Sequence, residues 1–140
     1  ITDWHKKQLG SNWNDSINGG ANDPGVLSVR SIFNYYKYFN IQTEVMGASF
    51  RNIEQIKNLA GCDLLTISPE LLGELQKTEG TLSVALSITE AKTLKLNALN
   101  TSEKAFRYQL NADAMATEKL AEGIRLFCID IEKLEAKLTS

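Results

Sequence analysis

The sequence TEVMGASFRNIEQIKNLAG at residues 43–61 indicates a β-strand that runs directly into an α-helix. Its first part is short, β-branched or apolar, and ends in small residues, which is typical of a strand. Its second part repeats aliphatic side chains with helical spacing, at Ile53, Ile56 and Leu59 or Ala60. Asn52 is suited to cap this helix, with Gln55 three residues later as in a capping box, and Gly61 is a natural end. The stretch therefore predicts half of a β/α repeat.

The junction between this strand and this helix carries groups that suit an anion. Gly47 and Ala48 are small enough to leave room above the end of the strand. Ser49 offers a hydroxyl, Arg51 offers a planar fork of donors, and the first turn of the helix offers unpaired N–H groups. Together these groups predict an anion site, most naturally for a phosphate. The residues alone leave one alternative open, because many such junctions are ordinary helix caps with a solvated arginine.

A second half-repeat follows at once. DLLTI at residues 63–67 predicts a buried strand, and Ser68 then caps a helix that begins at Pro69. The apolar positions of this helix are Leu71, Leu72 and Leu75. Two strands that each lead into a helix indicate a parallel sheet. Such a two-stranded sheet leaves both edges unpaired, and the chain opens at Ile1 without methionine, so we expect part of the protein to lie outside this chain.

Helices are predicted ahead of these repeats. Residues 2–9 form a short helix capped by Thr2 or Asp3, and residues 11–22 are rich in Asn, Gly and Ser, which is typical of a loop. A longer helix follows the cap at Asp23. Its spacing predicts one apolar face, made of Val26, Val29, Ile32 or Phe33, Tyr36 and Phe39.

The region that follows the second half-repeat is less regular. Residues 81–88 alternate enough to predict an edge strand. Helix resumes after a cap at Ser102, and a long amphipathic helix is predicted from residue 113 to residue 138. Its predicted inner stripe is Ala116, Leu120, Gly123, Ile124, Phe127, Ile131, Leu134 and Leu138.

The composition narrows the class of protein. The 140 residues are 43% hydrophobic and 23% charged, which fits one soluble globular domain or a large piece of one. The net charge of −2 does not favour nucleic acid or an anionic membrane as a partner. The sequence has no apolar run long enough for a membrane span and opens with no signal peptide, so it predicts a cytoplasmic protein. Cys62 and Cys128 form no CxxC pair and His5 is the only histidine, so we expect no metal site and two reduced, largely buried thiols.

Five short segments resemble the transaldolase family. They are MGASFRN at 46–52, DPGV at 23–26, AGCD at 60–63, NADAMA at 111–116 and LAEGI at 120–124. They follow the order of the family over nearly the whole chain. The resemblance implies an α/β fold, the TIM (β/α)8 barrel, in which the two predicted strands would be the seventh and eighth. Such barrels take about 250 residues, so the resemblance implies the C-terminal portion of a barrel, mostly helical and with about two parallel strands in this chain.

The resemblance also implies an activity. Transaldolases belong to the pentose phosphate pathway and transfer a dihydroxyacetone unit from a ketose phosphate (sedoheptulose 7-phosphate, fructose 6-phosphate) to an aldose phosphate (glyceraldehyde 3-phosphate, erythrose 4-phosphate). They act through a Schiff base on a lysine and need no cofactor. That lysine and the acid/base carboxylate belong to earlier strands, so we expect no catalytic residue in this chain and no activity from it alone.

The site residues that the resemblance implies are those of the junction. Ser49 and Arg51 would bind the substrate phosphate, with Phe50 adjacent to the substrate. The implied partners are sugar phosphates and the N-terminal part of the same enzyme, and a homodimer is compatible with the family. The alternative from another class is a noncatalytic fragment that self-associates by exchanging its open sheet edges and binds phosphate weakly at most.

Overall fold

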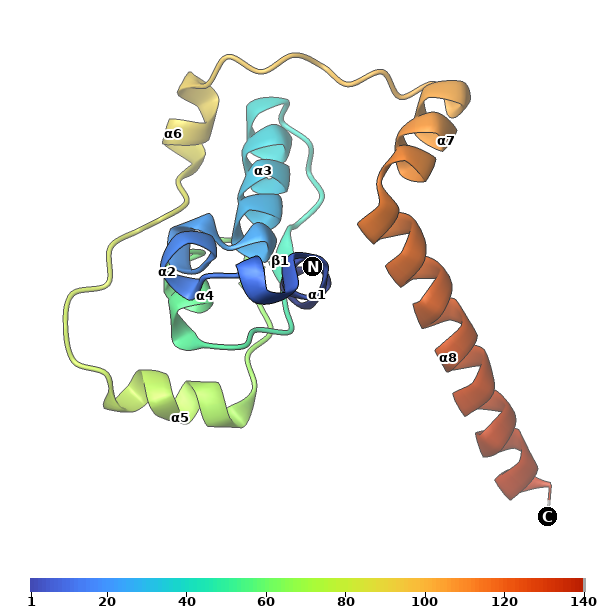
Figure 1. Ribbon diagram of the computed structural model, residues 1–140. Coiled ribbons are helices and arrows are strands. Elements are labelled where there is room, and N and C mark those ends of the chain that lie inside the picture. The colour runs from blue at the N-terminus through green and yellow to red at the C-terminus, as the bar shows by residue number, and fades with distance from the viewer. Residues whose placement is uncertain (140) are drawn as a thin grey trace. The chain divides into compact units, whose positions relative to one another are not determined.

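The computed structural model describes residues 1–139 and is mostly helical, with one pair of parallel strands (Figure 1). It divides into two compact units, Ile1–Asn97 and Ala98–Ser140, which are described separately below. Each strand leads into a helix, as the sequence predicts for a portion of a β/α barrel. The predicted parallel order is confirmed.

The sheet of the first unit is shorter than the sequence predicts. Strand β1 is Met46–Gly47 and strand β2 is Leu64–Leu65, with Met46 opposite Leu64 and Gly47 opposite Leu65. The N–H of Leu64 donates to the carbonyl of Val45 at 3.1 Å, which extends the contact by one residue. No further strand pairs with either of them in residues 1–139. In the described residues, regular parallel pairing is therefore limited to the two residues of each strand.

The helix after each strand begins where its cap predicts. Helix α4 is Ile53–Lys57, and the Asn52 side chain accepts a hydrogen bond from the Gln55 N–H at 3.0 Å. Helix α5 is Pro69–Lys77, capped by Ser68. Gly61 lies in the turn after α4 with φ +101°, and a Cβ there would lie 2.1 Å from the carbonyl oxygen of Leu86. The glycine is therefore required by a close approach of two backbone segments, in addition to its left-handed conformation.

Helix α3, Pro24–Tyr38, provides the main wall of the core. Its buried side chains Val26 and Phe33 form a cluster with Val45, Leu59 and Leu86. Three of these side chains, Phe33, Leu59 and Val26, are only 1% exposed. The sequence left Ile32 and Phe33 as alternatives for one position of the apolar face. The structure places Phe33 there, because Phe33 is buried and Ile32 is exposed. A half-buried ion pair of 2.7 Å between Lys37 and Asp63 joins the end of α3 to the start of β2.

The first residues of the chain fold as helices. Helix α1 is Thr2–Leu9, as predicted, but its N-cap is Ile1 with no side-chain cap, so the predicted capping role of Thr2 or Asp3 is wrong. Both side chains bond to other segments instead. The predicted loop contains the short helix α2, Asp15–Asn18, and two 3-10 turns, Gly10–Asn12 and Gly20–Asn22.

The edge strand predicted at residues 81–88 is wrong. The N–H groups of Ala85 and Leu86 both donate to the carbonyl of Ala60, at 2.8 and 2.9 Å, in the turn after α4. Helix α6, Ile88–Thr93, then begins after a cap at Ser87. Leu86 enters the core, but Leu82 and Val84, which share its phase in the alternation, are 61% and 71% exposed, and residues 1–139 provide no partner strand for this segment.

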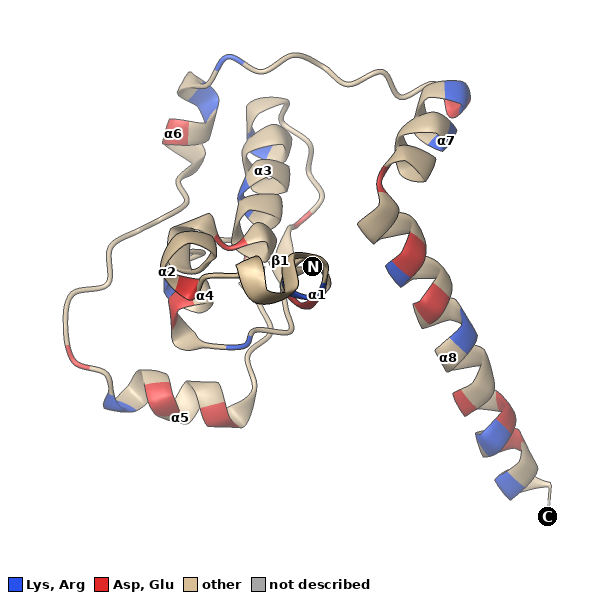
Figure 2. Ribbon diagram, viewed as in Figure 1, with Lys and Arg blue, Asp and Glu red and all other residues tan. Residues whose placement is uncertain are grey.

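The described part of the second unit, residues 98–139, contains two helices. Helix α7 is Glu103–Ala112, capped by Ser102, and helix α8 is Ala114–Leu138, capped by Asp113. Both helices and the cap at Ser102 agree with the sequence prediction. Charged side chains of both signs are interspersed along α8 (Figure 2).

The predicted burial of the α8 stripe is not seen in residues 1–139, and α8 contains no buried residue. The large side chains of the stripe are all more than half exposed: Leu120, Ile124, Phe127, Ile131, Leu134 and Leu138. The predicted burial of Cys128 is likewise wrong, because this cysteine on α8 is exposed, whereas Cys62 is half-buried. The amphipathic pattern is thus present without a surface that covers it.

Candidate functional site

The predicted site lies where the chain passes from β1 to α4. Ser49 adopts φ +59°, in the left-handed region, and this turns the backbone from the strand toward the helix. That conformation costs a residue with a Cβ about 1–2 kcal/mol, so the turn is unusual for a serine. The Ser49 side chain is exposed, and its hydroxyl has no hydrogen-bond partner within residues 1–139. The hydroxyl is therefore available to a ligand.

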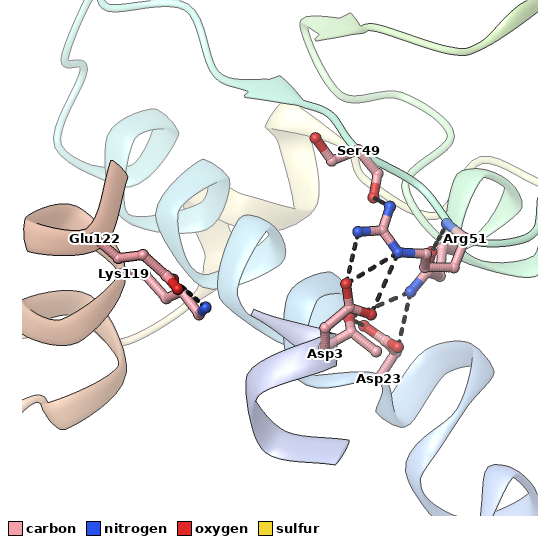
Figure 3. Close-up of polar contacts among 8 residues, drawn as sticks. Asp3, Asp23, Ser49, Arg51, Lys119 and Glu122 are labelled. Atoms are coloured by element: carbon pink, nitrogen blue, oxygen red, sulfur yellow. Dashed lines mark hydrogen bonds and ion pairs between the residues drawn. The ribbon is translucent and has the colours of Figure 1, made fainter. Parts of the chain in front are cut away.

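Arg51 is held by a carboxylate from α1. Its Nη2 donates to Oδ2 of Asp3 at 2.6 Å, and its Nε donates to the same oxygen at 3.1 Å (Figure 3). Its Nη1 donates to the backbone carbonyl of Ser49 at 3.0 Å. The hydrogen bonds from Arg51 hold the pKa of the Asp3 carboxyl below its ordinary value. Ser49 and Arg51 are thus brought together, but through the Ser49 carbonyl and with Asp3 as a third member.

A buried polar network supports the backbone of the junction. The Gln55 side chain accepts a hydrogen bond from the Arg51 N–H at 2.7 Å and donates one to Oδ2 of Asp23 at 2.9 Å. Asp23 also accepts from the Thr2 hydroxyl at 2.8 Å and from two N–H groups at the start of α3. Asp23 is 3% exposed and Gln55 is 5% exposed. The network therefore ties the starts of α1, α3 and α4 together beneath the junction.

Two parts of the predicted anion site differ in the structure. The N–H groups of Arg51 and Gln55 are already engaged inside the chain, so they are not available to an anion. The space above Gly47 is also occupied, because a Cβ there would lie 3.0 Å from Leu65 and 3.1 Å from the Phe50 ring. Gly47 thus makes room for side chains of the protein. The side-chain donors of Ser49 and Arg51 remain available at the junction.

Phe50, predicted to adjoin the substrate, is half-buried against the core cluster. It lines a cavity of about 120 Å³ at the junction. Ala48, Ser49 and Arg51 line this cavity together with Thr2, Asp3 and Asp23.

The sequence reasoning missed Asp3 and the supporting role of Gln55. Asp3 is 48 residues from Arg51, and nothing in the local pattern of α1 points to that contact. Gln55 did carry a signal, its capping-box position, but its side chain accepts from the N–H of Arg51 and not from that of the cap residue Asn52.

Within the described residues, no group of three or more His, Cys, Asp or Glu side chains is arranged to hold a metal ion. In the same part of the chain, no helix has the length and apolar character that a membrane span requires.

Comparisons with known proteins place these observations in a family. The family model described as "Transaldolase/Fructose-6-phosphate aldolase" matches residues 1–138. A curated relative, the transaldolase of Methylibium petroleiphilum, is 58% identical over 135 residues, which cover 96% of this chain and 43% of that protein. The chain thus spans less than half the length of this relative.

Proposed function

This chain belongs to the transaldolase/fructose-6-phosphate aldolase family, and we propose that it is the C-terminal, phosphate-binding part of a transaldolase. In this proposal β1 and β2 are the seventh and eighth strands of the barrel, and polypeptide outside these residues provides the other six. Three observations support it. The chain matches 43% of the length of its relative, the two strands pair only with each other within residues 1–139, and the α8 stripe is exposed there.

The observation that carries the phosphate role is the position of Arg51 and Ser49. Both follow directly after β1, and the ends of parallel strands in barrels hold the active site, with phosphate commonly bound after strands seven and eight. The Asp3 carboxylate accepts hydrogen bonds from the Nε N–H and from one N–H of Nη2 of Arg51, and the Ser49 carbonyl accepts one from Nη1. One N–H on each terminal nitrogen remains, and such groups suit phosphate oxygens. The Ser49 hydroxyl adds a further donor.

In the proposed reaction this chain binds and orients, and the covalent chemistry belongs to the rest of the enzyme. The substrates are ketose phosphates such as sedoheptulose 7-phosphate and fructose 6-phosphate, and aldose phosphates such as glyceraldehyde 3-phosphate and erythrose 4-phosphate. A lysine outside these residues forms the Schiff base with the ketone. In this chain Lys37 is paired with Asp63 and Lys57 with Glu54, and neither follows a strand end. Fixing the phosphate holds the sugar at the distance that this lysine needs.

Borohydride trapping tests the location of the Schiff base. The complete enzyme, treated with borohydride in the presence of fructose 6-phosphate, is expected to carry the label on a lysine outside residues 1–140. Peptide mass mapping locates it. A label on any lysine of this chain would refute the proposed division of roles.

Substitution of the arginine tests the phosphate role. In the complete enzyme, Arg51→Ala is expected to raise KM for phosphorylated substrates, since a hydrogen bond to a charged group contributes about 1.5–3 kcal/mol. Lys57→Ala, which removes another cation of the same unit from an ion pair with Glu54, is the matched control and should leave KM unchanged. An Arg51→Ala enzyme with the wild-type KM would contradict the proposal.

A second candidate function is favoured by the open strands. Met46 and Leu64, which face each other in the sheet, are 55% and 41% exposed. Exposed strands of this kind pair readily with another copy, so a noncatalytic, self-associating fragment with weak phosphate binding is the alternative. Sedimentation of residues 1–140 with and without the remaining polypeptide separates the two. Dissociation into an active one-to-one complex supports the enzyme, and persistent oligomers without activity support the fragment.

A further inference from the structure

We propose that Asp3 is a positioning residue for the phosphate site. Its carboxylate accepts hydrogen bonds from one edge of the Arg51 guanidinium and so directs the remaining N–H donors toward the substrate. This inference rests on the proposed function of Arg51 and extends it to a residue on a different helix. The carboxylate itself does not contact the substrate in this account.

The geometry of the contact defines which donors stay available. Asp3 takes the Nε edge of the guanidinium, with Nη2 to Oδ2 at 2.6 Å and Nε to Oδ1 and Oδ2 at 3.3 and 3.1 Å. The Ser49 carbonyl takes one N–H of Nη1 at 3.0 Å. The planar group is therefore fixed at three nitrogens, which sets both its direction and its rotation. Figure 3 shows the guanidinium between the Ser49 carbonyl and the Asp3 carboxylate.

Asp3 is itself held in place through its neighbour. The Thr2 hydroxyl donates to buried Asp23, and Asp23 accepts from Gln55, whose side chain accepts from the backbone N–H of Arg51. The same network thus fixes the backbone next to Asp3 and the backbone of Arg51. Since a long arginine side chain loses much rotamer freedom on binding a ligand, holding it beforehand lowers the cost of that binding.

Charge alone predicts the opposite effect. Asp3 brings a negative charge close to the place proposed for a phosphate, and like charges repel. If Asp3 acted only through its charge, its removal would strengthen phosphate binding. Positioning and repulsion therefore predict changes of opposite sign, and the experiment can distinguish them.

The test uses Asp3→Asn, Asp3→Glu and Arg51→Ala, each in the complete enzyme, and the double variant of Asp3→Asn with Arg51→Ala. The measured quantities are kcat, KM for glyceraldehyde 3-phosphate, KM for unphosphorylated glyceraldehyde, and the inhibition constant of inorganic phosphate. Asp15→Asn is the matched control, because Asp15 is an exposed aspartate of the same unit that bonds to Trp13 and Lys6 instead of Arg51. Thermal unfolding checks that each variant is folded.

We expect Asp3→Asn to raise KM for the phosphorylated acceptor and the inhibition constant of phosphate about fivefold, since a charged hydrogen bond is weakened without being lost. The KM for glyceraldehyde and kcat should change little, Asp3→Glu should restore part of the affinity, and Asp15→Asn should behave as wild type. In the Arg51→Ala background, Asp3→Asn should have no further effect.

Each other result overturns a defined part of the account. If Arg51→Ala leaves both phosphate constants unchanged, the proposed phosphate site fails and the inference fails with it. If Arg51→Ala weakens phosphate binding but Asp3→Asn leaves it unchanged or strengthens it, only the positioning role fails. The positioning role also fails if Asp15→Asn raises the phosphate constants as much as Asp3→Asn does. It fails likewise if Asp3→Asn has its full effect in the Arg51→Ala background.

Discussion

The two units of this chain use equally clear helix signals with different results. In the first unit, α3 places Phe33 in a cluster where it is 1% exposed. In the second unit, α8 carries Phe127 in its apolar stripe, and this side chain is 74% exposed. Both helices begin after an aspartate cap and both have an amphipathic pattern. Helix formation and burial are therefore separate outcomes of the sequence.

The difference shows what each outcome requires. A helix is specified by its caps and its period, which lie within a few residues of each other. Burial requires a second surface, and α3 finds one in the turn after α4 and in the segment around Leu86. A fully buried Leu, Ile or Phe side chain gains about 1.5–3 kcal/mol, so we propose that another part of the protein covers this stripe of exposed residues. This agrees with the proposal that most of the barrel lies outside these residues.

The largest effect is expected from truncating the two phenylalanines. Phe33→Ala should lower the free energy of unfolding by about 3–5 kcal/mol, both in residues 1–140 and in the complete enzyme, because its core is complete within the first unit. Phe127→Ala should cost under about 0.5 kcal/mol in residues 1–140. In the complete enzyme, where we expect the stripe to be covered, its cost should approach that of Phe33→Ala. Urea unfolding followed by circular dichroism measures both.

The comparison of the two units is tested by the difference between the cost of Phe127→Ala in residues 1–140 and its cost in the complete enzyme. If Phe127→Ala costs the same small amount in the complete enzyme, the stripe stays exposed there and the barrel explanation of the second unit fails. If Phe127→Ala strongly lowers the free energy of unfolding of residues 1–140, the stripe is already covered without the rest of the enzyme, for example by a second copy of this chain.

A smaller effect is expected from the network beneath the junction. Gln55→Leu removes the link between Asp23 and the Arg51 N–H and leaves buried polar groups without their partner, which costs about 1–3 kcal/mol. Gln42→Leu is the matched control, because the Gln42 side chain makes a single exposed hydrogen bond to a backbone carbonyl. Chemical denaturation of the complete enzyme measures both variants. Equal stabilities would show that the network does not hold the junction.

Sequence reasoning succeeded where the controlling groups are close in the chain. The caps at Asp23, Asn52, Ser68 and Ser102 all lie where predicted, because each depends on a partner two or three residues away. The errors arose from distant contacts. The segment at 81–88 has the alternating pattern of a strand, but the N–H groups of Ala85 and Leu86 bond to the carbonyl of Ala60 in a turn and not to a sheet. The proposed site was predicted from its two local members, Ser49 and Arg51, whereas the contact of Asp3 with Arg51 spans 48 residues and could not be predicted from a local pattern.

The smallest effect concerns pH and the Lys37–Asp63 pair, which closes the first unit between α3 and β2. Burial raises the pKa of Asp63, but the hydrogen bonds from Lys37 and the Val45 N–H and the charge of Lys37 outweigh it, so that the pKa lies below the ordinary 3.8. A carboxyl whose pKa is lower in the folded state contributes stability that is fully present above its unfolded value and is lost as the pH falls through the folded value. Asp63→Asn should therefore reduce the free energy of unfolding by about 1–2 kcal/mol at pH 7.

The reduction should shrink as the pH falls below 3.8, because the wild-type protein then loses the same interaction. Asp130→Asn on α8, which breaks an ion pair with Lys133 whose two side chains are each 68% exposed, provides the comparison in the second unit. Exposed pairs contribute about 0–1 kcal/mol, so this variant should lower the free energy of unfolding by less at pH 7. Equal reductions for the two variants at pH 7 would show that the ion pair of the first unit gains nothing from its burial, and that the two units differ in their apolar contacts alone.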